Sequence, residues 1–171
     1  MSARIKLAVP GSLVFRDVAI RAVASACQLV RDSSVTNDMG LSLDLAHEFD
    51  AHMVSAVSEI FNNIVIHGYR RPVLDLDAAD LPAEPSVSAE TIEFELILSN
   101  YQLEVIITDC GETFDITDVP SPELDKLPEG GMGIHIARSF VDELVYTGGQ
   151  PNIWRLIKSI TQPKSVTQRD R

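Results

Sequence analysis

The stretch EIFNNIVIHGY, residues 59–69, ends a long amphipathic helix that the sequence predicts over about 44–68. Hydrophobic side chains recur along this helix at helical spacing, which indicates a face packed against a sheet. Glu59, Asn63 and His67 follow one another at intervals of four residues, so they lie on one side of the helix, about one turn apart. The stretch therefore predicts the longest helix of the fold and a row of polar side chains beside its apolar face.

An advance of about 100° per residue places the apolar side chains of this helix between about 40° and 160° from Glu59. This face is made by Leu45, Phe49, Met53, Ala56, Val57, Ile60 and Ile64. By the same count, Asn63 at about 40° and His67 at about 80° fall within the buried face. Burying an amide or an imidazole without partners costs about 1–3 kcal/mol, so both side chains need hydrogen bonds. Either the core supplies these bonds, or the helix end borders a polar cavity in which an amide oxygen suits Mg²⁺ and Glu59 suits a general base.

The other hydrophobic segments predict a single domain over residues 1–160, followed by a polar tail at 161–171. Predicted strands are 4–9, 91–98, 102–109, 145–147 and 153–160, and the two further helices are 12–31 and 133–144. The two central strands alternate in polarity and are separated by a short turn, which is typical of an antiparallel hairpin. This order of elements favours an α/β (α+β) fold, a two-layer sandwich with helices on one face of a mixed, largely antiparallel sheet.

The first helix and the loops complete the expected organisation. Ser12 is a candidate N-cap for the helix at 12–31. Its apolar stripe is expected to consist of Val18, Ala22, Ala26 and Leu29. Residues 71–89 and 110–130 are rich in proline and acidic residues and indicate irregular surface segments.

Composition restricts the partners and the compartment. The formal net charge of -11 argues against direct binding of nucleic acid or of an anionic membrane surface, both of which attract basic proteins. Cys27 and Cys110 are too few for a disulfide framework or a zinc cluster. Neither a signal peptide nor a run of about 20 apolar residues is present, so we expect a cytoplasmic protein without a membrane segment.

Two glycine-containing stretches provide further candidate site residues. In ITDCGETFD, residues 107–115, a strand ends at Asp109, whose carboxylate can accept a hydrogen bond from an exocyclic amine, while Gly111 lets a flat ring approach the backbone. In PEGGMGIHIARSF, residues 128–140, glycines lead directly into a helix whose free N–H groups suit a phosphate. Neither spacing matches a Walker loop or a dinucleotide fingerprint.

These three stretches together resemble the N, G1 and G2 boxes of the GHKL ATP-binding superfamily, in the family's order. EIFNNIVIHGY is similar to the N box, DCGETF to the G1 box and GGMGIHIARSFVDELVY to the G2 box. The strongest resemblance is to bacterial anti-sigma-factor serine-protein kinases of partner-switching systems, and it covers roughly residues 4–160. It implies the histidine kinase-like ATPase fold, with ATP and Mg²⁺ as cofactors.

The resemblance implies a role for each matching residue. Asn63 would coordinate Mg²⁺, Glu59 would be the catalytic base and His67 would lie near the nucleotide. Asp109 would recognise the adenine amine, with Gly111 beside it.

The resemblance also implies a phosphate-binding segment and a lid. The further nucleotide-binding residues would be Phe114, Gly130, Gly131, Met132 and Gly133. Of these, Gly131 and Gly133 would contact phosphates. Residues 115–130 would cover ATP, with Lys126 as the only cation of this lid, and the acidic segment 71–89 is longer than the family norm.

The function implied is that of an ATP-dependent serine-protein kinase and anti-sigma factor. Such a protein phosphorylates an antagonist on serine, sequesters a sigma factor or similar regulator and commonly forms a homodimer. The alternative is a non-catalytic ATP-binding module whose affinity for a protein partner is switched by nucleotide. Retention of Glu59 favours the enzyme, since a pure binder needs no base. A third hypothesis is an α/β regulator that binds no nucleotide. It requires that all three motifs occur in the chain by coincidence.

Overall fold

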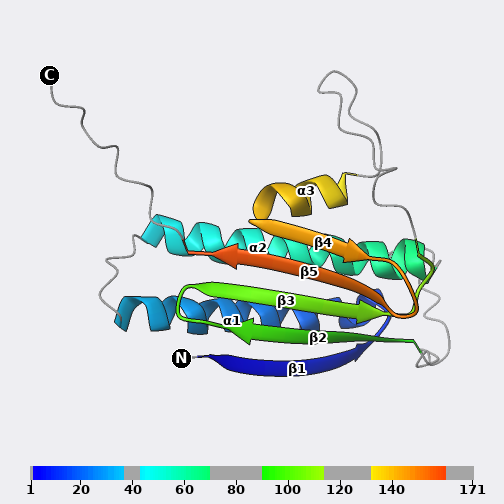
Figure 1. Cartoon of the computed structure of the whole chain (residues 1–171), viewed down its shortest axis with the longest axis horizontal. Coiled ribbons are helices and arrows are strands. Elements are labelled where there is room, and N and C mark those ends of the chain that lie inside the picture. The colour runs from blue at the N-terminus through cyan, green and yellow to red at the C-terminus, as the bar shows by residue number, and fades with distance from the viewer. Residues whose placement is uncertain (1, 37–42, 70–89, 114–131, 161–171) are drawn as a thin grey trace, which may run out of the picture.

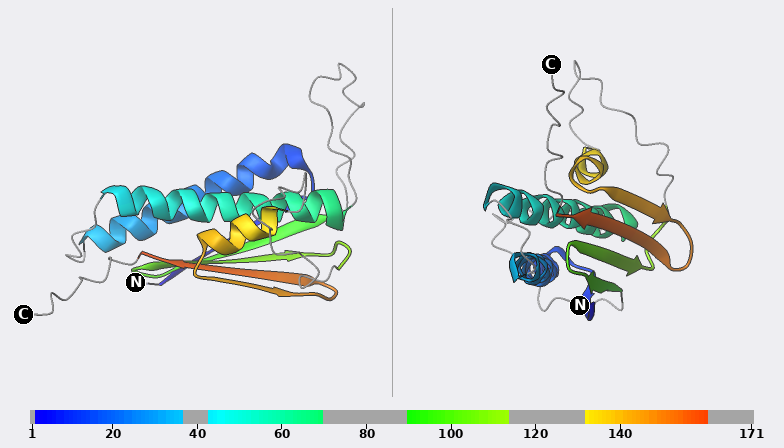
Figure 2. Two further views of the ribbon diagram at one scale, coloured as in Figure 1. Left: turned by 90° about the horizontal axis from the view of Figure 1, so that it is seen from above. Right: turned by 60° about the vertical axis from the view of Figure 1, so that its left-hand side comes forward.

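The computed structural model describes residues 2–36, 43–69, 90–113 and 132–160, which form a sheet with helices on one face. Figure 1 shows the strands in front of the two long helices, and Figure 2 shows the two layers from the side. The predicted two-layer fold is confirmed. Among the described residues, no helix is both long and apolar enough to cross a membrane.

The sheet contains five strands in the order β1-β2-β3-β5-β4. Their bounds are Ala3–Pro10 (β1), Thr91–Leu98 (β2), Gln102–Asp109 (β3), Glu143–Thr147 (β4) and Asn152–Ser159 (β5). All four described pairs of neighbouring strands are antiparallel, whereas the sequence predicted a mixed, largely antiparallel sheet. The predicted hairpin is confirmed as β2 and β3, closed by the bond from Ser99 N–H to the carbonyl of Gln102 at 2.9 Å.

The helical layer consists of α1 (Arg16–Thr36), α2 (Leu43–Asn63) and the short α3 (Gly133–Phe140). A 3-10 turn, η1 (Leu13–Phe15), precedes α1, and a π-helical turn, η2 (Ile64–Gly68), continues α2. Helix α2 packs against both α1 and α3, so it is the central element of the layer. Alternating side chains of β2 and β3 meet α2 in a common core that includes Phe49, Ile60, Leu96 and Val105.

The buried face of α1 differs from the expected stripe. Val18 is 50% exposed and Leu29 is 51% exposed, whereas Ala26 is buried as predicted. The buried stripe is instead formed by Ala19, Val23, Ala26, Cys27 and Val30. Alanine and valine occur all around this helix, so periodicity alone does not identify the side that meets the sheet.

The predicted ends of two helices also require correction. Ser12 makes no side-chain cap, and its carbonyl instead accepts a bond from Phe15 N–H at 3.0 Å in the 3-10 turn before α1. Helix α3 ends at Phe140 rather than at 144, because Val141 adopts an extended conformation and leads into β4. The following residues therefore belong to the sheet edge and not to the helix.

Matched valine substitutions test the orientation of α1. Val23→Ala should lower the free energy of unfolding by about 2 kcal/mol, because it removes buried methyl groups and leaves a cavity. Val18→Ala removes the same atoms from an exposed position and should change the free energy of unfolding by less than about 0.5 kcal/mol. Urea denaturation followed by circular dichroism measures both. Equal losses in the two variants would contradict the orientation.

The two cysteines should differ sharply in reactivity. Cys27 is fully buried, and burial raises the pKa of its thiol from 9.0 to about 12, so little reactive thiolate forms in the native state. Cys110 is exposed at the end of β3. With the chromogenic thiol reagent DTNB at pH 8, we expect one thiol to react rapidly in the native protein and the second only after unfolding. Rapid reaction of a native Cys110→Ser variant would contradict this assignment.

Candidate functional site

The last turn of α2 widens into the π-helical turn η2, in which Tyr69 N–H donates to the carbonyl of Ile64 at 2.9 Å. Ile64 and Val65 in this turn are buried, but His67 is exposed. The prediction that His67 points into the buried face is therefore wrong. A wider turn advances by less than 100° per residue, so the α-helical count no longer holds after Asn63.

Glu59 and Asn63 meet the start of α3 at Gly133. A Cβ atom on Gly133 would lie 2.6 Å from Glu59 Oε2 and 3.4 Å from Asn63 Nδ2, so a side chain at this position would displace the carboxylate. Both side chains of α2 are partly exposed. Asn63 Nδ2 is nevertheless buried and has no hydrogen-bond partner among the described residues. The structure thus brings together three residues that the sequence predicted from two separate motifs.

The end of α2 also contacts the end of β3 through two glycines. Glu112 N–H donates to the carbonyl of Gly68 at 2.9 Å. A Cβ atom on Gly111 would lie 2.9 Å from both the Cα and the carbonyl carbon of Gly68. Cβ atoms in proteins essentially never come this close to a non-bonded atom. The two backbones can approach this closely because Gly111 carries no side chain. This contact links the first and second predicted motifs.

Asp109, the last residue of β3, is a buried carboxylate with one free oxygen. Only 2% of its surface is exposed. Its Oδ1 accepts hydrogen bonds from Gly111 N–H at 2.8 Å and from Asn152 Nδ2 at 3.0 Å. Its Oδ2 is buried and lacks a partner within the described ranges. A buried acceptor without a donor is costly in isolation, so this oxygen suits a ligand that brings an N–H group.

Asn152, the first residue of β5, was missed by sequence reasoning. It is 2% exposed, and its Nδ2 also donates to the carbonyl of Gly111 at 3.0 Å. A signal was present, because Asn152, Trp154 and Leu156 alternate on the core-facing side of the strand. An amide at an inward position of a strand requires polar partners, and the two that connect it to the site, Asp109 and Gly111, are distant in sequence.

Tyr69 borders the same region at the end of η2. A Cβ atom on Gly11 would lie 2.3 Å from a ring carbon of Tyr69, so the ring rests directly on the turn after β1. Burial, followed by the charge of Asp109, raises the pKa of the phenol to about 12. Tyr69 is therefore neutral at physiological pH and adds no second negative charge beside the carboxylate.

The remaining predicted site residues are described only in part. Met132 precedes α3, and its carbonyl accepts Ile136 N–H at 2.9 Å. Phe114, Gly130 and Gly131 lie outside the described residues, as do the whole lid at 115–130 and the acidic segment at 71–89.

The donors and acceptors of this region fit a nucleotide better than a bare metal ion. Asp109 Oδ2 and Asn63 Nδ2 have no hydrogen-bond partner among the described residues, and Asn63 lies beside Gly133 at the start of α3, where the N–H groups of a first helical turn have no acceptor within the helix. Within residues 2–36, 43–69, 90–113 and 132–160, no three acidic, histidine or cysteine side chains are grouped as a metal site. Mg²⁺ is commonly held by only one or two protein oxygens together with phosphates, so these residues are compatible with a magnesium–nucleotide complex.

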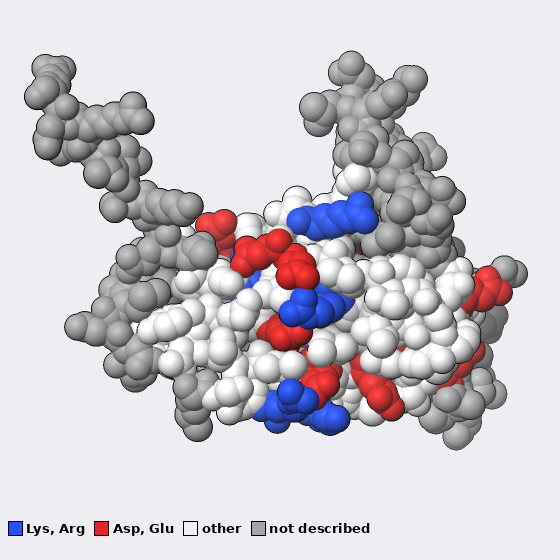
Figure 3. Space-filling model, viewed as in Figure 1, with Lys and Arg blue, Asp and Glu red and all other residues white. Residues whose placement is uncertain are grey.

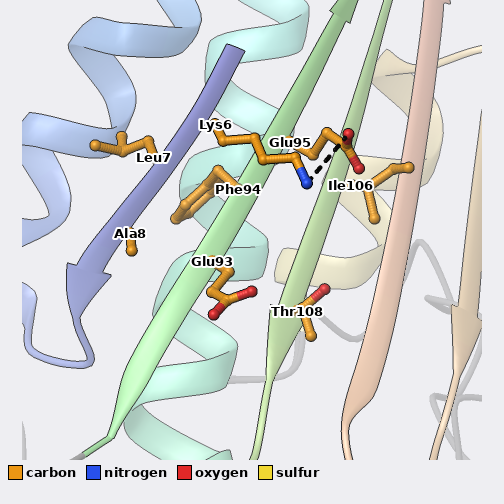
Figure 4. A pocket seen from close by; sticks show the side chains of 8 residues that line it. All are labelled: Lys6, Leu7, Ala8, Glu93, Phe94, Glu95, Ile106 and Thr108. Carbon is orange, nitrogen blue, oxygen red and sulfur yellow. Dashed lines mark ion pairs between the residues drawn. The ribbon is translucent and has the colours of Figure 1, made fainter. Parts of the chain in front are cut away.

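A hollow on the opposite face of the sheet does not belong to this site. It has a volume of about 360 Å³ and is lined by Lys6, Leu7, Ala8, Glu93, Phe94, Glu95, Ile106 and Thr108 (Figure 4). Acidic and basic side chains alternate across this face (Figure 3), and some form ion pairs, such as Arg155 with Glu104 at 2.6 Å. No predicted site residue lines the hollow, and paired charges are typical of a solvated sheet face.

Comparison with known proteins identifies the family of the chain. Residues 19–158 match the histidine kinase-like ATPase domain family. The chain is 32% identical over 120 residues to "Serine-protein kinase RsbW" of Bacillus licheniformis, an alignment that covers 66% of this chain and 63% of that protein. It is 29% identical over 120 residues, with the same coverage, to "Serine-protein kinase RsbW" of Bacillus subtilis (strain 168). The chain thus spans less than two thirds of the length of these relatives. Since the family match extends over more than half of the sequence, the chain belongs to the histidine kinase-like ATPase domain family.

Proposed function

We propose that the protein is an ATP- and Mg²⁺-dependent serine-protein kinase that phosphorylates an antagonist protein and sequesters a sigma factor or similar regulator. It acts in the cytoplasm as a homodimer, with proteins rather than nucleic acid or membrane as partners. The names of the two Bacillus relatives support the serine kinase activity. The single observation that carries the proposal is the contact of Glu59 and Asn63 with Gly133 at the start of α3.

Asp109 and Gly111 form the adenine end of the proposed site. The free Oδ2 of Asp109 accepts a hydrogen bond from the exocyclic amine, and Gly111 leaves its backbone open to the ring. His67, exposed at the end of η2, lies one residue from the Gly68–Gly111 contact and lines the nucleotide from outside the core. Phe114 follows on the same segment as Gly111 and remains a prediction.

Asn63 and the start of α3 form the phosphate end. Gly133 and Met132, preceded in the chain by Gly130 and Gly131, supply backbone N–H groups to the phosphates. The amide oxygen of Asn63 would hold Mg²⁺. When bound, this ion neutralises the negative charge that phosphoryl transfer concentrates on the phosphate oxygens.

Glu59 is the base of the proposed reaction. The serine hydroxyl oxygen of the antagonist forms a bond to the γ-phosphorus while the bond from that phosphorus to the bridging oxygen breaks, and ADP leaves. The carboxylate of Glu59 accepts the hydroxyl proton. It is partly exposed, and no hydrogen bond or ion pair of this carboxylate is found in the described part of the chain, so it is free to take this role.

Thermal unfolding tests the magnesium–nucleotide site. ATP at 100 times its dissociation constant should stabilise the native protein by about 2.7 kcal/mol, so the unfolding temperature should rise. The rise should be larger with Mg²⁺ than with EDTA. Asn63→Ala should remove most of the difference between the two conditions, because it removes the proposed ligand. If Mg²⁺ raised the unfolding temperature of ATP-bound Asn63→Ala as much as that of the native protein, the assignment of Asn63 would be contradicted.

Isosteric replacement of Glu59 tests the enzyme against the binding module. In Glu59→Gln, transfer of labelled γ-phosphate from ATP to serine of the antagonist should fall at least about 100-fold, because the base is lost. The dissociation constant for ATP should remain within a few fold. Glu48→Gln is the matched control, since Glu48 is exposed on the same helix.

The native antagonist for this assay comes from affinity capture in the host, identified by mass spectrometry with and without ATP. Unchanged transfer by Glu59→Gln would contradict the role of Glu59. Tight ATP binding by the native protein without phosphorylation of any captured partner would favour the nucleotide-switched module.

A further inference from the structure

Asn152 uses its complete hydrogen-bonding capacity inside the protein. Its Nδ2 donates to Asp109 Oδ1 and to the carbonyl of Gly111, both at 3.0 Å. Its Oδ1 accepts hydrogen bonds from Tyr146 O–H and from Gly149 N–H, both at 3.1 Å. An asparagine side chain offers two donors and two acceptor positions, so all four are occupied.

These partners determine the orientation of the amide. The carbonyl of Gly111 can only accept, and the N–H of Gly149 can only donate. Rotating the amide by 180° would place oxygen against two acceptors and the NH₂ group against a donor. The side chain of Asn152 is therefore held in one orientation, with its donors directed at Asp109 and Gly111.

Asn152 in turn fixes the plane of the Asp109 carboxylate. The bond from Gly111 N–H to Oδ1 comes from two residues along the same segment, and by itself it would leave the plane of the carboxylate free to tilt about that bond. The donor from Asn152 arrives from the neighbouring strand, because Asp109 and Asn152 are directly paired in the β3–β5 ladder. Oδ1 thus receives two donors from different directions, and Oδ2 is buried with no hydrogen-bond partner among the residues that the structure describes.

We propose that Asn152 is a positioning residue that holds Asp109 with Oδ2 directed at the amine of the nucleobase, and thereby determines selectivity for a 6-aminopurine. The proposal rests on the nucleotide site described above. Asn152 acts through Asp109 and also ties the turn between β4 and β5 to the base site, through Tyr146 and Gly149.

The test compares the dissociation constants for ATP and for purine riboside triphosphate, which has the same ring without the amine. A hydrogen bond to a charged acceptor contributes enough for the native protein to prefer ATP by about tenfold or more. In Asn152→Ala the preference for ATP should fall to about threefold or less, because the plane of the carboxylate is no longer fixed and its acceptor can tilt away from the amine. Affinities are measured by titration calorimetry below the unfolding temperature of each variant.

Tyr146→Phe is the matched control. It removes one bond to Oδ1 of Asn152 but leaves both donors to Asp109 and Gly111 in place, so its ratio should stay within about twofold of the native value. If the alanine variant does not fold, Asn152→Leu replaces the amide by an apolar side chain of similar size, and the same loss of the ratio is expected.

A purely structural role for Asn152 would weaken both ligands equally. A folded Asn152 variant that retains the native ratio would therefore overturn the proposal while leaving the proposed function intact. A native protein that binds neither triphosphate would overturn the proposed function itself, and the positioning role with it.

Discussion

The close approach of two backbones, Gly68 at the end of η2 and Gly111 after β3, is the constraint on which the site depends. The bond from Glu112 N–H to the carbonyl of Gly68 joins the helical layer to the sheet at the point where both elements end. Any side chain on Gly111 would meet the backbone of Gly68, so the two layers could not close at this edge. The end of η2 therefore lies beside the segment that follows Asp109.

A second close contact extends this region along α2. Gly133, the first residue of α3, leaves room for the carboxylate of Glu59, which a side chain at this position would displace. At the other end of α3, Lys158 Nζ donates to the carbonyl of Phe140 at 2.7 Å, and the Phe140 ring stacks on His52 at 4.5 Å. The short helix is thus held at both ends, which keeps its first residue beside Asn63.

Sequence reasoning recovered the parts of the fold and site that depend on local pattern. The spacing of Glu59 and Asn63 follows from an ordinary α-helix, and strand alternation before Asp109 predicts a polar residue at a strand end. The exposure of His67 could not be predicted, since the π-helical turn leaves no signal in an α-helical count. Asn152 was missed because its partner Asp109 lies 43 residues away and is reached only through strand pairing.

Asp109 Oδ2 and Asn63 Nδ2 are buried without a hydrogen-bond partner in the described part of the chain, and we propose that Asp109 binds the base and that Asn63 lies at the phosphates. A crystal structure with Mg²⁺ and a non-hydrolysable ATP analogue tests this arrangement most directly. The account predicts the exocyclic amine within hydrogen-bond distance of Asp109 Oδ2 and Mg²⁺ on the amide oxygen of Asn63. An analogue bound on the open face of the sheet, or bound with its base away from Asp109, would contradict it.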